Sequence, residues 1–488
     1  MIASFINDMV LGNIWGYVFF GYTLLVMLSY LTLAVISLTA LRGYLRRNQS
    51  TDYKDIMKSP LAPSVSLIAP AYNEEKTIVH NIHSLLSLTY TNYEIIVVND
   101  GSTDETLSAA VNAYDMELVN FDINHILPTE KVRGVYKSKN PAYSHLLVVD
   151  KENGGKSDAL NVGINLSVND YIMCIDVDCV LADDALLKLM KPFLEEGSRK
   201  VIAAGGVLRI ANSCSIERGH LVESNVPRNW LSRAQTLEYL RAFLLARVAW
   251  SQLDGLILVS GALGVFDKQL VIQVGGYSRK TVGEDMELVI RMRRCMHEEK
   301  LPYRVAFIPD PLCWTETPET LPVLQQQRNR WTRGTIEVLR THRKMLLNPR
   351  YGRMGLISYP FWLLMEWFAP ILETTGFILA IVLGVQGLIN WPFFFLMLAL
   401  IWFFSMGMTA LTLFGEEITF RKYRSLSEVM RLFVTGLIEP FFFHPFLVYS
   451  AIRGNIDYLL GRNLWGNMTR KGFQANGSAK EIQVVKST

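Results

Sequence analysis

The chain has 488 residues, of which half are hydrophobic and only 19% are charged, whereas about 25% of the residues in an ordinary soluble domain are charged. With 48 basic and 45 acidic residues the formal net charge is +3, which excludes a strongly basic nucleic-acid-binding protein and an acidic disordered chain. The 5 cysteines form no CxxC pair, so neither a zinc framework nor a disulfide scaffold is expected, and reduced thiols facing the cytosol are the simplest interpretation.

The first long apolar segment covers residues 14–41 and contains no charged residue, so it exceeds the roughly 20 residues that a helix needs to cross a bilayer. Asp8 precedes it, and three arginines follow it within residues 42–47. A signal peptide carries its positive charges before a shorter apolar core, so the reverse order predicts an uncleaved anchor over residues 1–47. The positive-inside rule places its N-terminus outside and the following residues in the cytosol.

Residues 48–345 have the composition of a cytosolic α/β enzyme, because apolar strand-like runs alternate with helical stretches. The runs lie at residues 65–69, 93–98, 145–149, 171–175 and 201–206. Such alternation predicts a mostly parallel sheet that is covered by helices. Ligands of such sheets bind beyond the C-terminal ends of the strands.

Two further membrane helices are expected near the C-terminus, at about residues 368–385 and 391–413, where charges are few. A third apolar stretch, residues 432–452, is interrupted by proline and charged residues. It crosses the membrane, re-enters it or lies in its interface, and the sequence leaves these alternatives open. We assign residues 346–472 to membrane and interface helices and residues 473–488 to a polar, disordered tail.

Two motifs after predicted strands suit a nucleotide. Asp100 follows the second run within Asn-Asp-Gly-Ser, where a carboxylate can bind uracil or ribose, and the alternative is a plain helix cap. Lys156 follows Gly154 and Gly155, which let the backbone approach a ligand while the lysine offers a point charge for phosphate. The alternative is a glycine turn with a solvated lysine.

Asp176 and Asp178 follow the run at residues 171–175. On an extended chain two carboxylates two residues apart point to the same face, so both can address one Mg²⁺ or Mn²⁺ ion beyond the strand end. Such an ion would neutralise a diphosphate. The alternative is a solvated strand terminus.

Two further motifs are expected on helices. Asp285 stands at the start of a helical run, where it either caps the helix or acts as a general base on a sugar hydroxyl. Gln327, Arg330 and Trp331 occupy positions i, i+3 and i+4, so a helix brings an amide, a guanidinium and an aromatic ring to one face. That face suits a pyrophosphate beside a stacked sugar, and the alternative is an amphipathic helix on the membrane surface.

The order of these motifs between apolar segments resembles the processive family 2 glycosyltransferases, which include cellulose, hyaluronan, chitin and poly-N-acetylglucosamine synthases. The resemblance covers about residues 14–470, and the Gln-x-x-Arg-Trp motif is its most specific element. It implies an α/β GT-A fold with Rossmann-like nucleotide-sugar binding, inserted between transmembrane helices. It also implies a UDP-sugar donor, a growing glycan acceptor and an inverting, metal-dependent transfer without a covalent intermediate.

On the donor side, the resemblance implies a role for each matching residue. Asp285 is the general base, and Asp100 binds uridine. Lys156 lies near the diphosphate. Asp178 binds the metal ion, and Asp176 supports both the metal ion and the nucleotide.

On the acceptor side, Ser260 and Gly261 resemble the loop near the glycan terminus. Gln327, Arg330 and Trp331 resemble the motif that holds the diphosphate and stacks against the acceptor sugar. A helix that often lines this region carries Gln235, Glu238 and Arg241.

Three features depart from the family pattern. The base motif reads Gly-Glu-Asp rather than Thr-Glu-Asp, which keeps the carboxylate. Residues 113–144 exceed the minimal fold, and their prolines and mixed charges predict an inserted loop that could sense a partner. No D-x-S-x-x-G signature follows the membrane helices, so a cyclic dinucleotide domain like that of bacterial cellulose synthases is not expected.

We therefore expect a multi-pass protein of the inner or plasma membrane, with a cytosolic catalytic domain, that extends and extrudes a β-linked polysaccharide. UDP-N-acetylglucosamine ranks first as donor, because residues 260–264 and the short C-terminal region look most like poly-N-acetylglucosamine synthases, and UDP-glucose ranks second. The alternatives are an enzyme that adds one sugar to a lipid or short acceptor, and a transporter whose cytosolic part only binds nucleotide.

The expected partners are membrane lipid, the donor, the growing glycan and an accessory export subunit, with no nucleic acid. Glu366 and Glu373 stand seven residues apart in an apolar stretch, and intramembrane carboxylates usually face a protein interior or a wet cavity. We expect Glu373 to line or brace the exit path of the glycan. For Glu366 the alternative is an interfacial position beside a basic residue.

Overall fold

The computed structural model describes residues 2–48, 62–217, 219–423 and 425–462. These residues form two compact units, each assembled from segments that are separated in the sequence. Within the described residues, an α/β unit comprises Arg46–Pro227 and Leu256–Thr317, and a helical unit comprises Met1–Leu45, Arg228–Gly255 and Pro318–Gly466. The predicted domain boundaries after residues 47 and 345 stay predictions, and the predicted tail at residues 473–488 lies outside the described residues.

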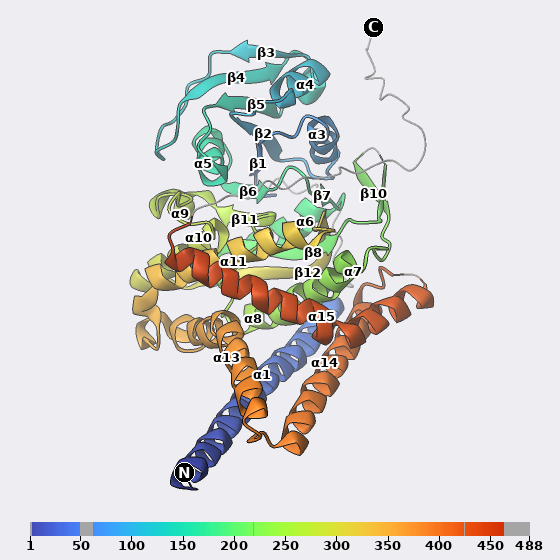
Figure 1. Cartoon of the computed structure of the whole chain (residues 1–488). Helices are drawn as coiled ribbons and strands as arrows, with labels where there is room; N and C mark the ends of the chain where they lie inside the picture. The colour runs from blue at the N-terminus through green and yellow to red at the C-terminus, as the bar shows by residue number, and fades with distance from the viewer. Residues whose placement is uncertain (1, 49–61, 218, 424, 463–488) are drawn as a thin grey trace. The chain divides into compact units, whose positions relative to one another are not determined.

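The α/β unit is built on a 10-stranded sheet in the order β3-β4-β5-β2-β1-β6-β11-β8-β12-β7 (Figure 1). Its strands are β1 (Val65–Ala71), β2 (Tyr93–Asp100), β3 (Met116–Val119), β4 (Val132–Ser138), β5 (Leu146–Lys151), β6 (Tyr171–Ile175), β7 (Val180–Leu181), β8 (Lys200–Ile210), β11 (Leu263–Asp267) and β12 (Tyr303–Thr315). A separate antiparallel hairpin joins β9 (Ser215–Glu217) to β10 (His220–Glu223).

Four neighbouring strands, β5, β2, β1 and β6, run parallel, and so do β8 and β12. The other pairings are antiparallel. Strand β11 runs against both of its neighbours, β6 and β8, strand β4 runs against both β5 and β3, and β7 runs against β12. The predicted mostly parallel sheet is therefore a mixed one. An apolar run has the same pattern in either strand direction, so the sequence did not reveal the reversals.

Helices pack on this sheet through apolar faces. They are α3 (Ile78–Leu86), α4 (Thr106–Ala113), α5 (Lys156–Leu166), α6 (Ala185–Leu194), α9 (Lys268–Gln273) and α10 (Glu284–Glu298). Ile78, Ile82 and Leu85 show how α3 does this, since they recur at helical spacing and are buried. Helix α5 comes so close to β1 that a side chain at Gly163 would collide with Ile68.

Residues 113–144 were predicted as an inserted loop, and this prediction was wrong for much of the segment. Strand β4 pairs antiparallel with β5, and β3 pairs antiparallel with β4, so the segment extends the sheet by two strands. A short 3₁₀ turn at Pro141–Tyr143 leads into β5. In β4 only Val135 is buried, and in the edge strand β3 only Met116 is buried, so neither strand has the continuous apolar run from which a strand was predicted.

The helical unit consists of α1 (Ile2–Asn48), α7 (Trp230–Tyr239), α8 (Val248–Gln252), α11 (Leu321–Thr341), α12 (Tyr359–Phe361), α13 (Ala369–Val385), α14 (Trp391–Thr419) and α15 (Leu426–Leu459). Four segments of the described residues are long and apolar enough to cross a membrane: Trp15–Asn48, Met354–Val385, Trp391–Thr419 and Leu426–Leu459. The helices expected at residues 368–385 and 391–413 are confirmed as α13 and α14.

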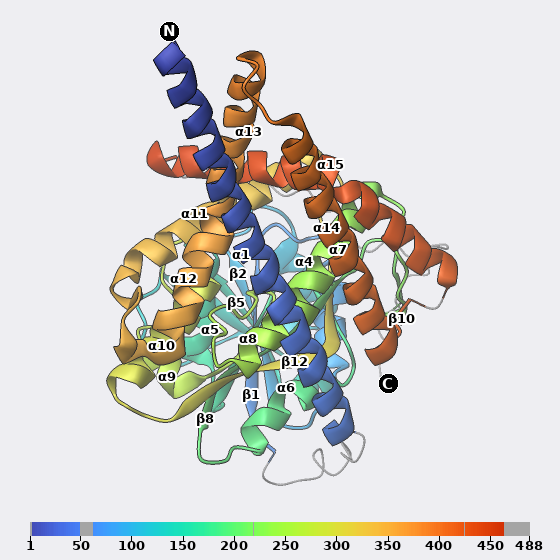
Figure 2. The same cartoon turned by 90° about the horizontal axis from the view of Figure 1, so that it is seen from below.

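Helix α15 resolves part of the ambiguity at residues 432–452. It runs as one helix through Pro440 and Pro445, so these residues do not turn back on themselves as a re-entrant loop would. Helix α15 crosses α14 in both views (Figures 1 and 2). Its length and composition suit a membrane crossing, while its interruptions suit an interfacial helix, and these two alternatives remain.

Candidate active site

The C-terminal ends of four parallel strands lie at one edge of the sheet in the α/β unit. Asn99 at the end of β2 pairs with Ala71 on β1 and with Asp150 on β5, and Asp100 pairs with Lys151. Because parallel strands in register end together, the segments that follow them meet at this edge. The predicted motifs around residues 100, 156 and 176 all start there.

Lys156 is the point at which several predicted residues converge. It is the first residue of α5, and its Nζ lies 2.5 Å from Oδ1 of Asp176. The same ammonium group donates to the carbonyl oxygen of Gly261 at 3.4 Å and lies 3.9 Å from Oε1 of Glu284. The fold thus brings together four segments. Lys156 follows β5, Asp176 follows β6, Gly261 precedes β11 and Glu284 begins α10.

Asp285 belongs to the same cluster. Its Oδ2 accepts a hydrogen bond of 2.9 Å from the backbone N–H of Gly261, and its Oδ1 accepts one of 2.8 Å from the N–H of Met286. A Cβ atom at Gly261 would lie 3.3 Å from both Asp285 Oδ2 and Lys156 Nζ, so a side chain there would press on both groups. The contact with Gly261 shows that Asp285 does more than cap α10.

Ser260 shapes the loop that presents Gly261. Its carbonyl oxygen accepts a hydrogen bond of 3.1 Å from the N–H of Leu263, and its hydroxyl accepts one of 3.4 Å from the N–H of Ala262. This turn leads directly into β11. The two residues predicted for this loop therefore lie beside the predicted base and the predicted phosphate-facing lysine.

The electrostatics of the cluster favour a further cation. Burial favours the neutral amine, but the charges of Asp176 and Glu284 outweigh it and raise the pKa of Lys156 above its usual range. The lysine therefore stays protonated at neutral pH, and three carboxylates share its charge, since Asp285 also acts on it. A bound diphosphate would add negative charge to an already negative cluster, so additional positive charge is needed for it to bind.

Asp176 and Asp178 are not two positions on an extended strand. Strand β6 ends at Ile175, and the N–H of Cys179 donates to the carbonyl oxygen of Asp176 at 3.0 Å, which closes a turn. The same-face argument was therefore wrong, because the chain bends as soon as the strand ends. Asp176 is half-buried beside Lys156, whereas Asp178 is buried.

The described residues contain no cluster of three or more His, Cys, Asp or Glu side chains that could hold a metal ion by itself. Mg²⁺ is usually bound through one or two carboxylates together with substrate phosphates, so the assignment of Asp176 and Asp178 as ligands of a Mg²⁺ or Mn²⁺ ion stays a prediction. The negative surplus around Lys156 is consistent with this.

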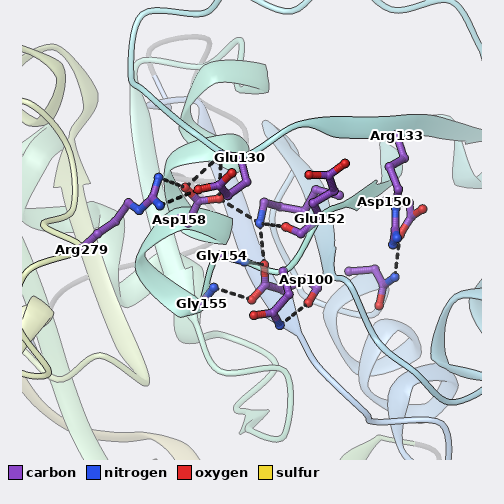
Figure 3. Close-up of polar contacts among 12 residues, drawn as sticks. Asp100, Glu130, Arg133, Asp150, Glu152, Gly154, Gly155, Asp158 and Arg279 are labelled. Carbon is purple, nitrogen blue, oxygen red and sulfur yellow. Dashed lines mark hydrogen bonds and ion pairs between the residues drawn. The ribbon is translucent and has the colours of Figure 1, made fainter. Parts of the chain in front are cut away.

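Asp100 is held inside the α/β unit and is only 3% exposed. Its Oδ1 accepts from Lys151 Nζ at 2.5 Å and from the N–H of Gly154 at 3.0 Å, and its Oδ2 accepts from the N–H of Gly155 at 2.8 Å (Figure 3). The next helix, α4, begins after Glu105, so Asp100 does not cap it. The carboxylate instead fixes the glycine turn that precedes Lys156.

Sequence reasoning missed two buried charges at this turn. Lys151 and Asp158 are both 0% exposed, and Lys151 Nζ lies 2.8 Å from Asp158 Oδ2 (Figure 3). Arg279 Nη1 lies 3.1 Å from Asp158 Oδ1. The available signal was weak: a lysine that ends a buried strand and an aspartate in the first turn of α5 both look like surface residues.

Gln327, Arg330 and Trp331 lie on α11 in the helical unit, as the predicted helix requires. Gln327 is 8% exposed and Trp331 is 41% exposed, so the shared face runs from the packed side of the helix to its surface. No donor among the described residues lies within hydrogen-bond distance of Gln327 Oε1. The indole ring is therefore accessible on this face, whereas the amide oxygen is buried and has no hydrogen-bond partner among the described residues.

Arg328 was not singled out from the sequence, yet it connects this helix to α7. Its Nη2 donates to Glu238 Oε2 at 2.7 Å, and its guanidinium carbon lies 4.1 Å from the centre of the Trp331 ring. Burial raises the pKa of the Glu238 carboxyl even though Arg328 and Arg241 act against it. Arg241 forms an ion pair with Glu439 of α15, with one contact of 2.9 Å.

Gln235 on α7, which was also named from the sequence, has a structural role. Its Nε2 donates to the carbonyl oxygens of Pro318 at 2.8 Å and Leu231 at 3.1 Å. It therefore ties α7 to the segment that leads into α11.

Comparisons with known families give two matches. Residues 66–210 match the family described as Glycosyl transferase family 2. Residues 171–406 match the family described as Glycosyl transferase family group 2. The two ranges overlap and together cover β1 to β12, α11, the first C-terminal membrane candidate and part of the second. Together with the mixed sheet, they confirm the predicted GT-A-like α/β class.

Curated relatives share about a third of the aligned residues. The chain is 30% identical over 304 residues to the poly-beta-1,6-N-acetyl-D-glucosamine synthase of Staphylococcus aureus, and this covers 62% of this chain and 60% of the relative. It is 31% identical over 276 residues to the protein of the same name from Staphylococcus epidermidis, covering 56% of this chain and 55% of the relative. The chain thus spans less than two thirds of these relatives.

Among solved structures, the chain is similar to the mannosyltransferase PcManGT from Pyrobaculum calidifontis, determined in complex with GDP-Man and Mn²⁺. The identity is 17% and the TM-score is 0.49, and the match covers 90% of this chain and 100% of the other.

Proposed function

We propose, from the family 2 glycosyltransferase domains that this chain carries, that it is a membrane-embedded hexosyltransferase which elongates and extrudes a β-linked polysaccharide. One observation supports this above all. Lys156, Asp176, Gly261 and Asp285 come from four separate segments and meet beyond the ends of parallel strands. A base, a phosphate-facing cation and metal-binding carboxylates are what transfer from a nucleoside diphosphate sugar needs.

The proposed donor is UDP-N-acetylglucosamine, with UDP-glucose second. The ranking is supported by the two staphylococcal relatives, which are named as synthases of poly-N-acetylglucosamine. Because the chain covers only 60% of the first of them, the activity, donor and acceptor of the whole protein are all part of the proposal. Four apolar helices support a location in the inner or plasma membrane, with the α/β unit in the cytosol.

In the proposed reaction, Asp285 takes the proton from a hydroxyl of the acceptor sugar. The hydroxyl oxygen attacks C1 of the donor sugar, the bond between C1 and the diphosphate oxygen breaks, and UDP leaves with the electron pair. The configuration at C1 inverts because attack and departure occur on opposite faces. The backbone N–H of Gly261 holds the carboxylate of Asp285 in place for this step.

Lys156 faces the leaving diphosphate, and Asp100 acts on the uridine side of the donor. A bound Mg²⁺ or Mn²⁺ would supply positive charge for the diphosphate, and Asp176 and Asp178 would hold it. On α11, Gln327 and Arg330 bind the diphosphate and Trp331 stacks against the acceptor sugar. Ser260 lies in the loop at the acceptor end.

The test uses the full chain, purified in detergent and incubated with a panel of UDP-sugars and Mg²⁺ or Mn²⁺. We expect UDP release with UDP-N-acetylglucosamine and a long product that a linkage-specific hydrolase degrades. A lipid or short acceptor that is extended by only one sugar would show that the protein transfers single sugars and does not polymerise them. Release of no UDP from any donor would contradict the assignment as a transferase.

A further inference from the structure

Three charged side chains lie buried together beside the glycine turn at residues 153–155. Lys151 is 0% exposed and contacts Asp100 at 2.5 Å and Asp158 at 2.8 Å. Its ammonium group also donates to the carbonyl oxygen of Glu152. Burying ions is costly unless each of them is paired and hydrogen-bonded, and removing one partner is strongly destabilising. Packing alone therefore does not explain why these three charged side chains are buried together.

We propose that Lys151 is a positioning residue of the donor site. By holding Asp100 and Asp158 against the glycine turn, it fixes the backbone from which Lys156 reaches the donor diphosphate. This inference rests on the proposed function, since it concerns affinity for a nucleoside diphosphate.

Asp100 and Asp158 contact the glycine turn at different points. Asp100 accepts from the N–H groups of Gly154 and Gly155 at 3.0 and 2.8 Å. Asp158 lies so close to Gly154 that a Cβ there would be 2.6 Å from its Oδ2. Asn153 adds a bond of 2.7 Å from its side chain to the carbonyl oxygen of Asp100. The ammonium group of Lys151 thus contacts both carboxylates that lie against the turn.

The turn determines where Lys156 begins. Gly155 has φ of 85°, a conformation that residues with side chains rarely adopt, and Lys156 follows it as the first residue of α5. The ammonium of Lys156 then has to reach Asp176 at 2.5 Å. A small shift of the turn would move both the backbone N–H groups and this lysine away from the positions in which they face the donor diphosphate, which would weaken binding of the donor.

Besides Lys151, two further residues, Arg279 and Glu130, contact Asp158. Arg279 lies 3.1 Å from its Oδ1, and the N–H of Glu130 donates to both of its oxygens at 3.1 and 3.2 Å. Arg279 also contacts the side chain of Glu130 at 2.6 Å. The segment that leads into β4 therefore helps to orient the buried aspartate, and through it the glycine turn.

The experiment compares UDP affinity, measured by calorimetry on the solubilised full chain, with thermal stability. Lys151→Met removes the shared ammonium, and Lys188→Met is its matched control. Lys188 likewise bridges two carboxylates of the α/β unit, Asp184 at 2.8 Å and Asp310 at 3.0 Å. Neither of these ion pairs involves a residue of the glycine turn. We expect both variants to melt earlier, and only Lys151→Met to raise the Kd for UDP.

Asp158→Asn keeps the shape of the side chain and serves as the decisive variant where Lys151→Met does not fold. We expect it to raise the Kd for UDP by about tenfold or more, the effect of losing one charged hydrogen bond, with KM for the donor rising while kcat falls little. An unchanged Kd in folded Asp158→Asn would overturn the proposal. If the unaltered protein itself failed to bind UDP, the proposed function would fail instead, so the two failures are distinguishable.

Discussion

At the scale of single residues, Asp285 is distinguished by the groups that hold it. Its two oxygens accept hydrogen bonds from the backbone N–H groups of Gly261 and Met286, so its position depends on main-chain geometry rather than on a flexible cation. Backbone donors cannot titrate or rotate away. The carboxylate therefore has a fixed orientation, as the proposed role of general base requires.

Replacing Asp285 by asparagine should separate chemistry from binding. The amide can still accept from Gly261 but cannot take a proton, so transfer should fall by about 10² to 10⁴, while the Kd for UDP changes little. Single-turnover sugar transfer and UDP calorimetry measure the two effects. An Asp285→Asn enzyme that retained most of its activity would disprove the assignment of the base.

The negative surplus around Lys156 leads to a second prediction. Transfer should stop in excess chelator and return with Mg²⁺ or Mn²⁺, because the lysine is already shared by three carboxylates and cannot neutralise a diphosphate alone. Asp178→Ala should weaken UDP binding in the presence of metal and leave the weak metal-free binding unchanged. Full activity in the chelator would contradict a metal requirement.

At the scale of elements, α11 and α7 are joined by one partly buried ion pair. Glu238 on α7 binds Arg328 on α11, and Arg328 stacks over the ring of Trp331. The guanidinium covers one face of the indole and limits its rotation. The exposed remainder of the ring therefore has a defined orientation, as the proposed stacking against an acceptor sugar requires.

Arg328→Met should therefore weaken acceptor binding without changing donor binding. We expect the KM for an acceptor oligosaccharide to rise roughly threefold to tenfold, the value of one cation–π contact, with an unchanged Kd for UDP. Arg340→Gln is the control, because Arg340 lies on the same helix, is exposed and bonds Tyr458 at 3.0 Å. Equal acceptor effects in both variants would argue against a specific role for Arg328.

At the scale of the whole molecule, the polar groups of the apolar helices find partners far away in the sequence. Glu373 on α13 lies 2.8 Å from His444 on α15, and Glu366 accepts from Tyr30 of α1 at 2.9 Å. Glu366 was expected, as one alternative, to pair with a basic residue, whereas in the structure it accepts a hydrogen bond from a tyrosine. In a membrane such groups usually face a protein interior or a wet cavity, and here the side chains of Glu373 and His444 are 43% and 54% exposed.

We retain the proposal that Glu373 braces the exit path of the glycan. Glu373→Leu should leave transfer of a single sugar within about twofold, since no chemistry depends on it, but should shorten the polymer measured by gel electrophoresis. His444→Leu should do the same, and the double variant should be no shorter, because both changes break one contact. Glu417→Gln, which removes the exposed pair with Arg421, should leave product length unchanged, and shortening by all the variants would indicate a nonspecific effect.

The sequence by itself determined the local order of this protein. Apolar runs located the central strands and the helices that are long and apolar enough to cross a membrane, because burial in a sheet or bilayer demands continuous apolar residues. The polar motifs after the strands located the candidate site. What it could not determine were the contacts between distant segments. The bond of Asp285 to Gly261 and the antiparallel return of β11 depend on chain direction, which an apolar run does not encode. The turn at Asp176 and the burial of Lys151 and Asp158 were hidden for another reason: only the tertiary structure supplies the opposite charges that make a buried ion tolerable.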